Sequence, residues 1–150
     1  MNRSKKLLTA SLAFVGLTAA AAAHAGPPVT VTFKNQATAT ATYTIITTNE
    51  NATYANASPK PAPTVLPSGT NIYTVTSLIS PNVNYANVRY KIGAKECVFG
   101  TTFVNALQPG GYYIPQWTKS ATGSGGAICT ATITSYNLST YAWTVDFVMK

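Results

Sequence analysis

Apolar and polar residues alternate along much of the chain, most clearly between Tyr85 and Ile92. A period of two is typical of a β-strand with one buried side, and here it would bury Ala86, Val88, Tyr90 and Ile92. The next residues, 93–95, begin with a glycine that tolerates a reversal, so 96–104 should return antiparallel. On that return Cys97, Phe99 and Phe103 share a face. The pattern therefore predicts a central β-hairpin.

The same alternation predicts further strands at 29–33, 37–45, 70–77 and 112–118, and a closing hairpin from 127–133 and 141–149. Residues 29–47 could also form one unbroken strand, because the turn signal at 34–36 is moderate. Pro115 places its strand at a sheet edge or a bulge. Residues 120–126 are rich in glycine and serine and predict a flexible loop. In the closing hairpin, Trp143 is expected to be buried opposite the Cys129 arm and to pack against a disulfide formed by Cys129.

Residues 49–69 form the longest stretch without a strand pattern, with prolines at 59, 61, 63 and 67. Such a segment cannot be a central strand, and it serves either as a surface connection or as a loop that carries binding. No helix is predicted. About eight antiparallel strands indicate an all-β fold, an antiparallel β-sandwich or a closely related barrel.

The amino-terminal residues resemble an export signal rather than part of the fold. Three basic residues within residues 3–6 precede an uncharged apolar run, and Ala23-His24-Ala25 matches a small-x-small cleavage site. We therefore expect a secretory signal peptide at 1–25, a single domain at 26–150, and an extracellular or periplasmic protein. The alternative is an uncleaved membrane anchor, which the following Gly-Pro-Pro would terminate.

Removing the signal changes the charge and the available chemistry. The formal net charge of +7 falls to 7 − 3 = +4, and the single histidine, His24, leaves as well. The remaining cysteines, Cys97 and Cys129, are an even pair in an exported chain and predict a disulfide. Two free thiols or a partial metal site are the alternative, but no histidine remains to complete a metal shell.

Catalytic chemistry has little support in the mature sequence. Without histidine there is no Ser-His or Cys-His pair, and the acids Glu50, Glu96 and Asp146 follow no catalytic spacing. We expect a protein that is not an enzyme and needs no cofactor or metal.

Two groups of residues are candidates for binding. Tyr112, Tyr113 and Trp117 would offer a platform for sugar rings or for the interfacial zone of a membrane if they are exposed, although Tyr113 and Trp117 could instead be core residues. The second group lies on the outer side of the central hairpin and consists of the basic residues Arg89, Lys91 and Lys95. These side chains could bind anionic lipid or an acidic partner, or they could form a solvated surface. Nucleic acid is not expected as a partner, because the basic residues are few.

Several short segments resemble the aegerolysins: Pro67-Ser-Gly-Thr before a strand, Val88-Arg-Tyr-Lys-Ile, a strand that carries a cysteine, and a closing Trp143-Thr-Val-Asp. The resemblance implies a secreted β-sandwich that binds membrane lipids and acts with partner proteins in pore formation. The chain departs from the family pattern at Val98-Phe-Gly-Thr, where the family carries a Trp/Cys/Pro cluster, and in its basic charge. No functional residue is transferred.

Together these features predict a secreted, non-catalytic protein that binds membrane lipid or glycan at an extracellular surface. A structural, self-associating subunit is the first alternative, because threonine-rich strands with few charges leave sheet edges poorly protected. An inhibitor of an extracellular enzyme is the second.

Overall fold

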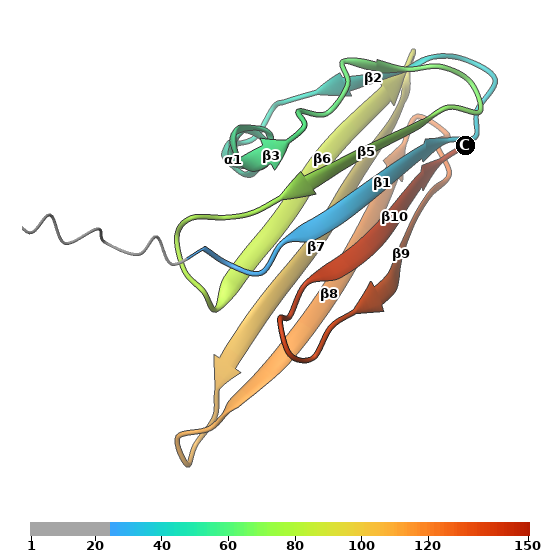
Figure 1. The fold of residues 1–150 in the computed structure, drawn as a ribbon. Helices are drawn as coiled ribbons and strands as arrows, with labels where there is room; N and C mark the ends of the chain where they lie inside the picture. The colour runs from blue at the N-terminus through green and yellow to red at the C-terminus, as the bar shows by residue number, and fades with distance from the viewer. Residues whose placement is uncertain (1–24) are drawn as a thin grey trace, which may run out of the picture.

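Two five-stranded β-sheets pack face to face in the computed structural model, which describes residues 25–150 (Figure 1). Most of the predicted signal peptide therefore lies outside the described residues. Sheet A has the order β3 (Ala57–Ser58), β5 (Thr70–Val75), β1 (Val29–Asn35), β10 (Trp143–Met149) and β9 (Cys129–Tyr136). Sheet B has the order β4 (Thr64–Val65), β2 (Ala41–Thr44), β6 (Val83–Ile92), β7 (Lys95–Leu107) and β8 (Tyr113–Ser124).

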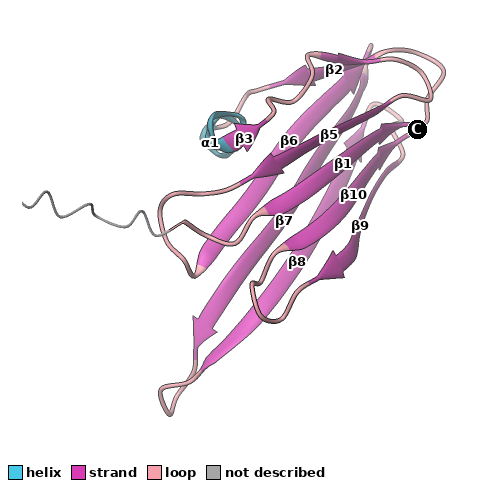
Figure 2. Ribbon diagram, viewed as in Figure 1, coloured by secondary structure: helices cyan, strands magenta, loops and turns pink. Residues whose placement is uncertain are grey.

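The predicted all-β sandwich is confirmed, with ten strands rather than eight (Figure 2). Every pairing is antiparallel except that of β1 with β10, which run parallel at the centre of sheet A. The residues of β1 and β10 alternate between buried and half-buried along their whole length. The last strand is thus paired on both sides and buried on one face, as the alternation at 141–149 predicts.

Aromatic rings fill the space between the sheets. Phe33 of β1 stacks on Tyr90 of β6 with 3.4 Å between ring centroids, and Phe99 of β7 stacks on Phe147 of β10 at 4.8 Å. Each pair joins one sheet to the other. Aromatic side chains bury large apolar areas, so these pairs make up much of the contact between the two sheets.

The central hairpin forms as predicted, from β6 and β7 at the centre of the long strands of sheet B. β6 and β7 pair from Val83↔Val104 to Ile92↔Lys95, and their inward residues are buried over 84–90 and 97–103. Ile92, predicted to be buried, is half-buried because it lies at the β6–β7 turn. The disulfide between Cys97 and Cys129 is also confirmed, with Cα atoms 5.7 Å apart. It joins β7 of sheet B to β9 of sheet A.

The prediction that the chain has no helix is wrong. Residues 48–56 form α1 (Thr48–Asn56), which begins at a capping box in which Thr47 and Glu50 each bind the other's backbone N–H. The helix lies beside β6, where Asn87 N donates to Thr53 Oγ1 at 2.9 Å. The stretch 49–69 is therefore an ordered helix followed by two short strands, rather than an irregular loop.

The strand predicted at 37–45 is shorter than expected, and the alternative of an unbroken strand from 29 to 47 is also wrong. Asn35 is buried, its Oδ1 accepts from Ala37 N, and its Nδ2 donates to Ala39 O at 2.8 Å and Val65 O at 2.9 Å. These bonds fold residues 36–40 into a bend, so only Ala41–Thr44 joins sheet B.

The flexible loop predicted at 120–126 is wrong as well, because β8 continues to Ser124 and pairs with β7 as far as Glu96. The edge position predicted from Pro115 is confirmed, since β8 is the last strand of sheet B. Trp143 is buried as predicted, but it does not pack against the disulfide. Met149 is the residue opposite Cys129, whereas Trp143 lies at the other end of β10, with its ring centroid 6.0 Å from that of Phe103.

Candidate binding surface

The β7–β8 hairpin projects beyond all other strands at one end of the sandwich (Figure 1). Its closing turn is fixed by hydrogen bonds from Gln108 N to Tyr112 O at 2.8 Å and from Gly111 N to Gln108 O at 3.1 Å. Gly110 and Gly111 both have positive φ, which glycine adopts without steric cost. The end of the hairpin is therefore a defined structure that stands away from the body of the protein.

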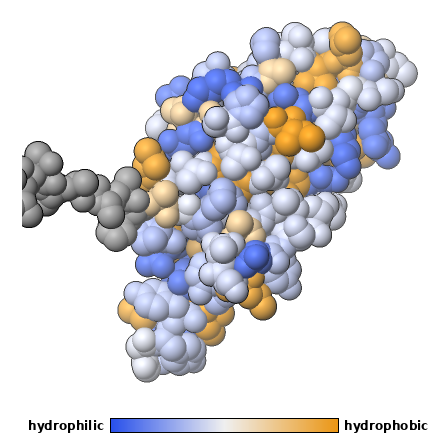
Figure 3. Space-filling view, in the orientation of Figure 1, coloured by the Kyte–Doolittle hydropathy of each residue, from blue (hydrophilic) through white to orange (hydrophobic). Residues whose placement is uncertain are grey.

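Large hydrophobic side chains are exposed on this hairpin, on the neighbouring loop 77–82 and at the start of β6. We call the following set the apolar end: Leu78, Ile79, Val83, Val104, Leu107, Tyr112, Tyr113 and Ile114. Five of the eight are more than half exposed, among them Leu107 at 61% and Tyr112 at 58%. In Figure 3 hydrophobic surface is visible at the projecting end of the molecule.

Strand pairing and three asparagines hold the parts of the apolar end together. Val83 is paired with Val104, and Asn105 N donates to Asn82 O at 2.8 Å, so loop 77–82 lies against the base of the hairpin. The buried Asn84 accepts from Ser77 N at 3.0 Å and donates to Pro27 O and Val75 O. The exposed side chains of the loop and the hairpin are thus presented on a fixed support.

Charge is distributed very unevenly between the two ends of the protein. Residues 76–88 and 97–118, which supply the whole apolar end, contain no charged residue. The opposite end carries Lys91, Lys95 and Glu96 at the β6–β7 turn and Lys150 after β10. Other exposed hydrophobic residues, such as Ile46 and Leu66, lie away from the apolar end. The apolar end is therefore distinguished by the absence of charge as well as by its exposed side chains.

The three aromatic residues predicted as a platform are not equivalent. Tyr112 and Tyr113 are exposed at the end of the hairpin, whereas Trp117 is half-buried further down β8. The Trp117 ring stacks on Tyr136 at 4.8 Å, and its Nε1 donates to Tyr141 O at 3.2 Å. Trp117 thus closes the side of the sandwich between β8 and β9, and the two tyrosines are free to meet a ligand.

The basic residues predicted as a second site lie in an ion-pair network. The Arg89 side chain is only 13% exposed and contacts both Glu50 and Glu96, and Lys91 Nζ lies 2.9 Å from Glu96 Oε2. Lys95 is half-buried beside this network. Arg89 is thus occupied in joining α1 to sheet B, and Lys91 and Lys95 remain the more accessible of the three.

Sequence reasoning missed that Glu50 and Glu96 meet at one arginine. Burial by itself would raise the pKa of Glu50, but N–H donors from Ile46 and Thr47 and the Arg89 guanidinium outweigh it and lower that pKa. The hydrogen bond from Lys91 is the main cause of the lowered pKa of Glu96. Both carboxylates are thus held ionised. The Thr47–Glu50 spacing was the one sequence signal that could have placed Glu50 at a helix start.

The third carboxylate, Asp146, pairs with Lys34 on the outer face of sheet A. Among residues 25–150 no group of three or more His, Cys, Asp or Glu side chains is placed to hold a metal ion. No helix in the described part of the chain is long and apolar enough to cross a membrane.

Comparisons with models of protein families, with curated proteins and with solved structures give no match.

Proposed function

We propose that this protein is a non-catalytic, exported binding protein that attaches to the surface of a lipid membrane through its apolar end. The observation that carries the proposal is a projecting, charge-free hairpin that exposes tyrosines and aliphatic side chains together. Tyrosine is favourable at the boundary between headgroups and acyl chains, where its ring is in an apolar layer and its hydroxyl in a wet one. The resemblance to the aegerolysins points in the same direction.

The energy available from the apolar end is adequate for reversible attachment. Transferring a half-exposed leucine, isoleucine or tyrosine from water to an apolar layer stabilises the bound state by about 1 kcal/mol. Five side chains of the set are more than half exposed, so their sum is about 5 kcal/mol. That value corresponds to weak binding by one molecule at a bilayer surface.

A vesicle sedimentation experiment tests the proposal. Wild-type protein should co-sediment with phosphatidylcholine vesicles, and the double variant Leu107→Ser/Tyr112→Ser should lose about thirtyfold in partition coefficient, from about 2 kcal/mol of lost transfer energy. The matched control is Ile46→Ser/Leu66→Ser, which changes two equally exposed residues away from the apolar end. Equal loss in both double variants, or no wild-type binding, would contradict the proposal.

The salt dependence of vesicle binding distinguishes attachment through the apolar end from attachment through the basic residues of the central hairpin. Binding through an uncharged end should change little between low and high ionic strength, whereas binding through Lys91 and Lys95 should require anionic lipid and weaken in salt. A parallel pull-down with insoluble polysaccharide tests the glycan alternative, and retention there without vesicle binding would favour it.

Self-association has less support from the sheet edges. On one side of the sandwich the edge strands β3 and β4 are only two residues long. On the other, β8 carries Pro115 and Lys119 and lies against β9. Short edges, proline and lysine all discourage pairing between molecules. Sedimentation velocity should therefore show a monomer in the absence of vesicles.

A further inference from the structure

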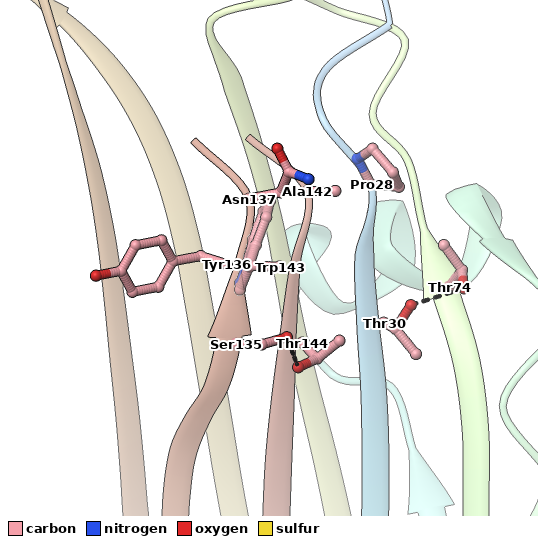
Figure 4. A pocket seen from close by; sticks show the side chains of 9 residues that line it. All are labelled: Pro28, Thr30, Thr74, Ser135, Tyr136, Asn137, Ala142, Trp143 and Thr144. Atoms are coloured by element: carbon pink, nitrogen blue, oxygen red, sulfur yellow. Dashed lines mark hydrogen bonds between the residues drawn. The ribbon is translucent and has the colours of Figure 1, made fainter. Parts of the chain in front are cut away.

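A groove of about 390 Å³ is present on the outer face of sheet A, where β5, β1, β10 and β9 lie side by side (Figure 4). This volume is in the range of about 300–1,000 Å³ that small-molecule sites occupy. It is lined by Pro28, Thr30, Thr74, Ser135, Tyr136, Asn137, Ala142, Trp143 and Thr144. None of these residues is charged, so the groove is suited to a neutral, polar ligand.

A row of hydroxyl groups crosses the groove from strand to strand. Thr74 is paired with Thr30, Thr30 with Thr144, and Thr144 with Ser135, so four strands each contribute one hydroxyl. Within the row Thr30 Oγ1 lies 3.3 Å from Thr74 Oγ1, and Ser135 Oγ lies 2.8 Å from Thr144 Oγ1. A hydroxyl has one donor and two acceptor positions, so each of these groups keeps capacity for a ligand.

A β-bulge adds one further hydroxyl, that of Thr134, at one side of the row. The register of β9 against β10 shifts between Thr144 and Val145, which places Thr134 and Ser135 together opposite Thr144. Both hydroxyls contact Thr144 Oγ1. Bulges are over-represented beside functional sites, where they redirect side chains, and this one concentrates polar groups in an otherwise regular strand pair.

Asn137 adds an oriented amide to the rim of the groove. Its Oδ1 accepts from Ser139 N at 2.8 Å and from Thr140 N at 3.0 Å, which fixes the side chain at the start of the β9–β10 turn. In Figure 4 the amide nitrogen of Asn137 lies on the side of Ala142. A donor of this kind beside a row of hydroxyls matches the alternating donors and acceptors of a sugar ring.

Two sets of contacts connect the groove to the apolar end. Pro28 follows Pro27, whose carbonyl accepts from Asn84 at 2.7 Å, and Asn84 also holds Ser77 at the start of loop 77–82. On the other side, Tyr136 of the groove stacks on Trp117 of β8, the strand that begins at the apolar end. A ligand with an apolar tail and a neutral polar head could therefore contact both surfaces at one end of the protein.

We infer that the groove binds the neutral sugar headgroup of a glycolipid while the apolar end contacts the surrounding bilayer. This inference rests on the proposed membrane attachment and adds a headgroup preference to it. Phosphate and ammonium headgroups have no ion-pair partner among the lining residues, whereas the sugar exchanges hydrogen bonds with the threonine and serine hydroxyls.

Vesicles of two compositions test the inference, phosphatidylcholine alone and phosphatidylcholine with monogalactosyl diacylglycerol. Wild-type protein should bind the galactolipid vesicles about tenfold more tightly, the gain expected from one or two net hydrogen bonds. Thr30→Val/Thr144→Val keeps the side-chain shape but removes two hydroxyls of the row, and it should bind both vesicles at the phosphatidylcholine level. The matched control Thr132→Val, on the outer face of β9 beyond the groove, should retain the tenfold gain.

The outcomes separate the two proposals. Equal wild-type binding to both vesicles, or a full gain in Thr30→Val/Thr144→Val with its fold intact by circular dichroism, overturns the headgroup site and leaves membrane attachment standing. A gain that Thr132→Val also abolishes overturns the assignment to the groove. Binding of free methyl galactoside without binding to either vesicle overturns the membrane source of the sugar together with the proposed function.

Discussion

Replacing Trp143 should remove a large part of the free energy of unfolding, because this side chain joins the two sheets. Trp143 is buried at the start of β10, and its Nε1 donates to Thr101 Oγ1 at 3.0 Å. Thr101 in turn donates to Thr118 O at 2.9 Å, so one chain of hydrogen bonds runs from sheet A through β7 to β8. The indole ring also packs near Phe103.

The expected losses follow from these contacts. Trp143→Ala removes the ring and leaves a cavity, which costs about 3–5 kcal/mol of the free energy of unfolding. Trp143→Phe keeps most of the ring but loses the donor to Thr101, which costs about 2 kcal/mol. Thr101→Val keeps the shape of its side chain but leaves the indole N–H and Thr118 O without their partner, at about 1–3 kcal/mol.

Urea denaturation followed by far-UV circular dichroism, and by the fluorescence of the remaining Trp117, measures each loss. A double-mutant cycle of Trp143→Phe with Thr101→Val should give a coupling energy of about 0.5–1.5 kcal/mol, because both changes remove the same hydrogen bond. Binding to vesicles should fall only as folding fails. A Trp143→Ala protein with unchanged stability but no vesicle binding would show that Trp143 faces outward and that this account of β10 is wrong.

Three further changes test other parts of the structure. Glu50→Gln should cost about 1.5–3 kcal/mol at neutral pH by weakening the contact with Arg89. Because the folded-state pKa of Glu50 is lowered from 4.5, its stabilisation is present above that pH and is lost as the pH falls through the folded-state pKa. Thermal melts at a series of acidic pH values should therefore converge for wild type and Glu50→Gln, and parallel curves would contradict this role. Gly123→Ala should destabilise the protein in thermal melts, because the added Cβ would lie 2.4 Å from Ala127 O, and an unchanged melting temperature would refute the close approach. Asn84→Ala should cost about 3 kcal/mol and speed hydrogen exchange in loop 77–82, and unchanged exchange would show that Asn84 does not hold the loop.

The regular strands could be predicted from the sequence because their period of two is local. In β6, β7 and β10 each residue's burial depends on which face it occupies, and alternation alone reports that face. The disulfide could be predicted for a different reason. The sequence has two cysteines, so each has one possible partner. Trp143 shows the limit of such reasoning. The alternation indicates that it faces the core, but its neighbours within the core depend on the register between β9 and β10.

The elements that were missed depend on single side chains acting over distance. The bend after β1 is made by Asn35, which reaches Val65 thirty residues away in the sequence, and no local pattern reports that bond. The residues of helix α1 favour helix formation only weakly. The helix is held against β6 by Glu50 and Thr53. The apolar end could be anticipated only in part. Tyr112 and Tyr113 could be named from the sequence, but only the pairing of Val83 with Val104 brings loop 77–82 to the base of the same hairpin.

The position of β10 has a consequence for when the protein can fold. β10 is the last strand along the chain, yet it lies between β1 and β9 and pairs with both. Until its residues are available, β1 and β9 have no common partner and Phe147 is absent from its stack on Phe99. Sheet A cannot close before β10 has been synthesised, because the pairing of β1 with β10 spans almost the whole described sequence. Contacts between residues so far apart form slowly, so this topology makes the completion of sheet A a late step in folding.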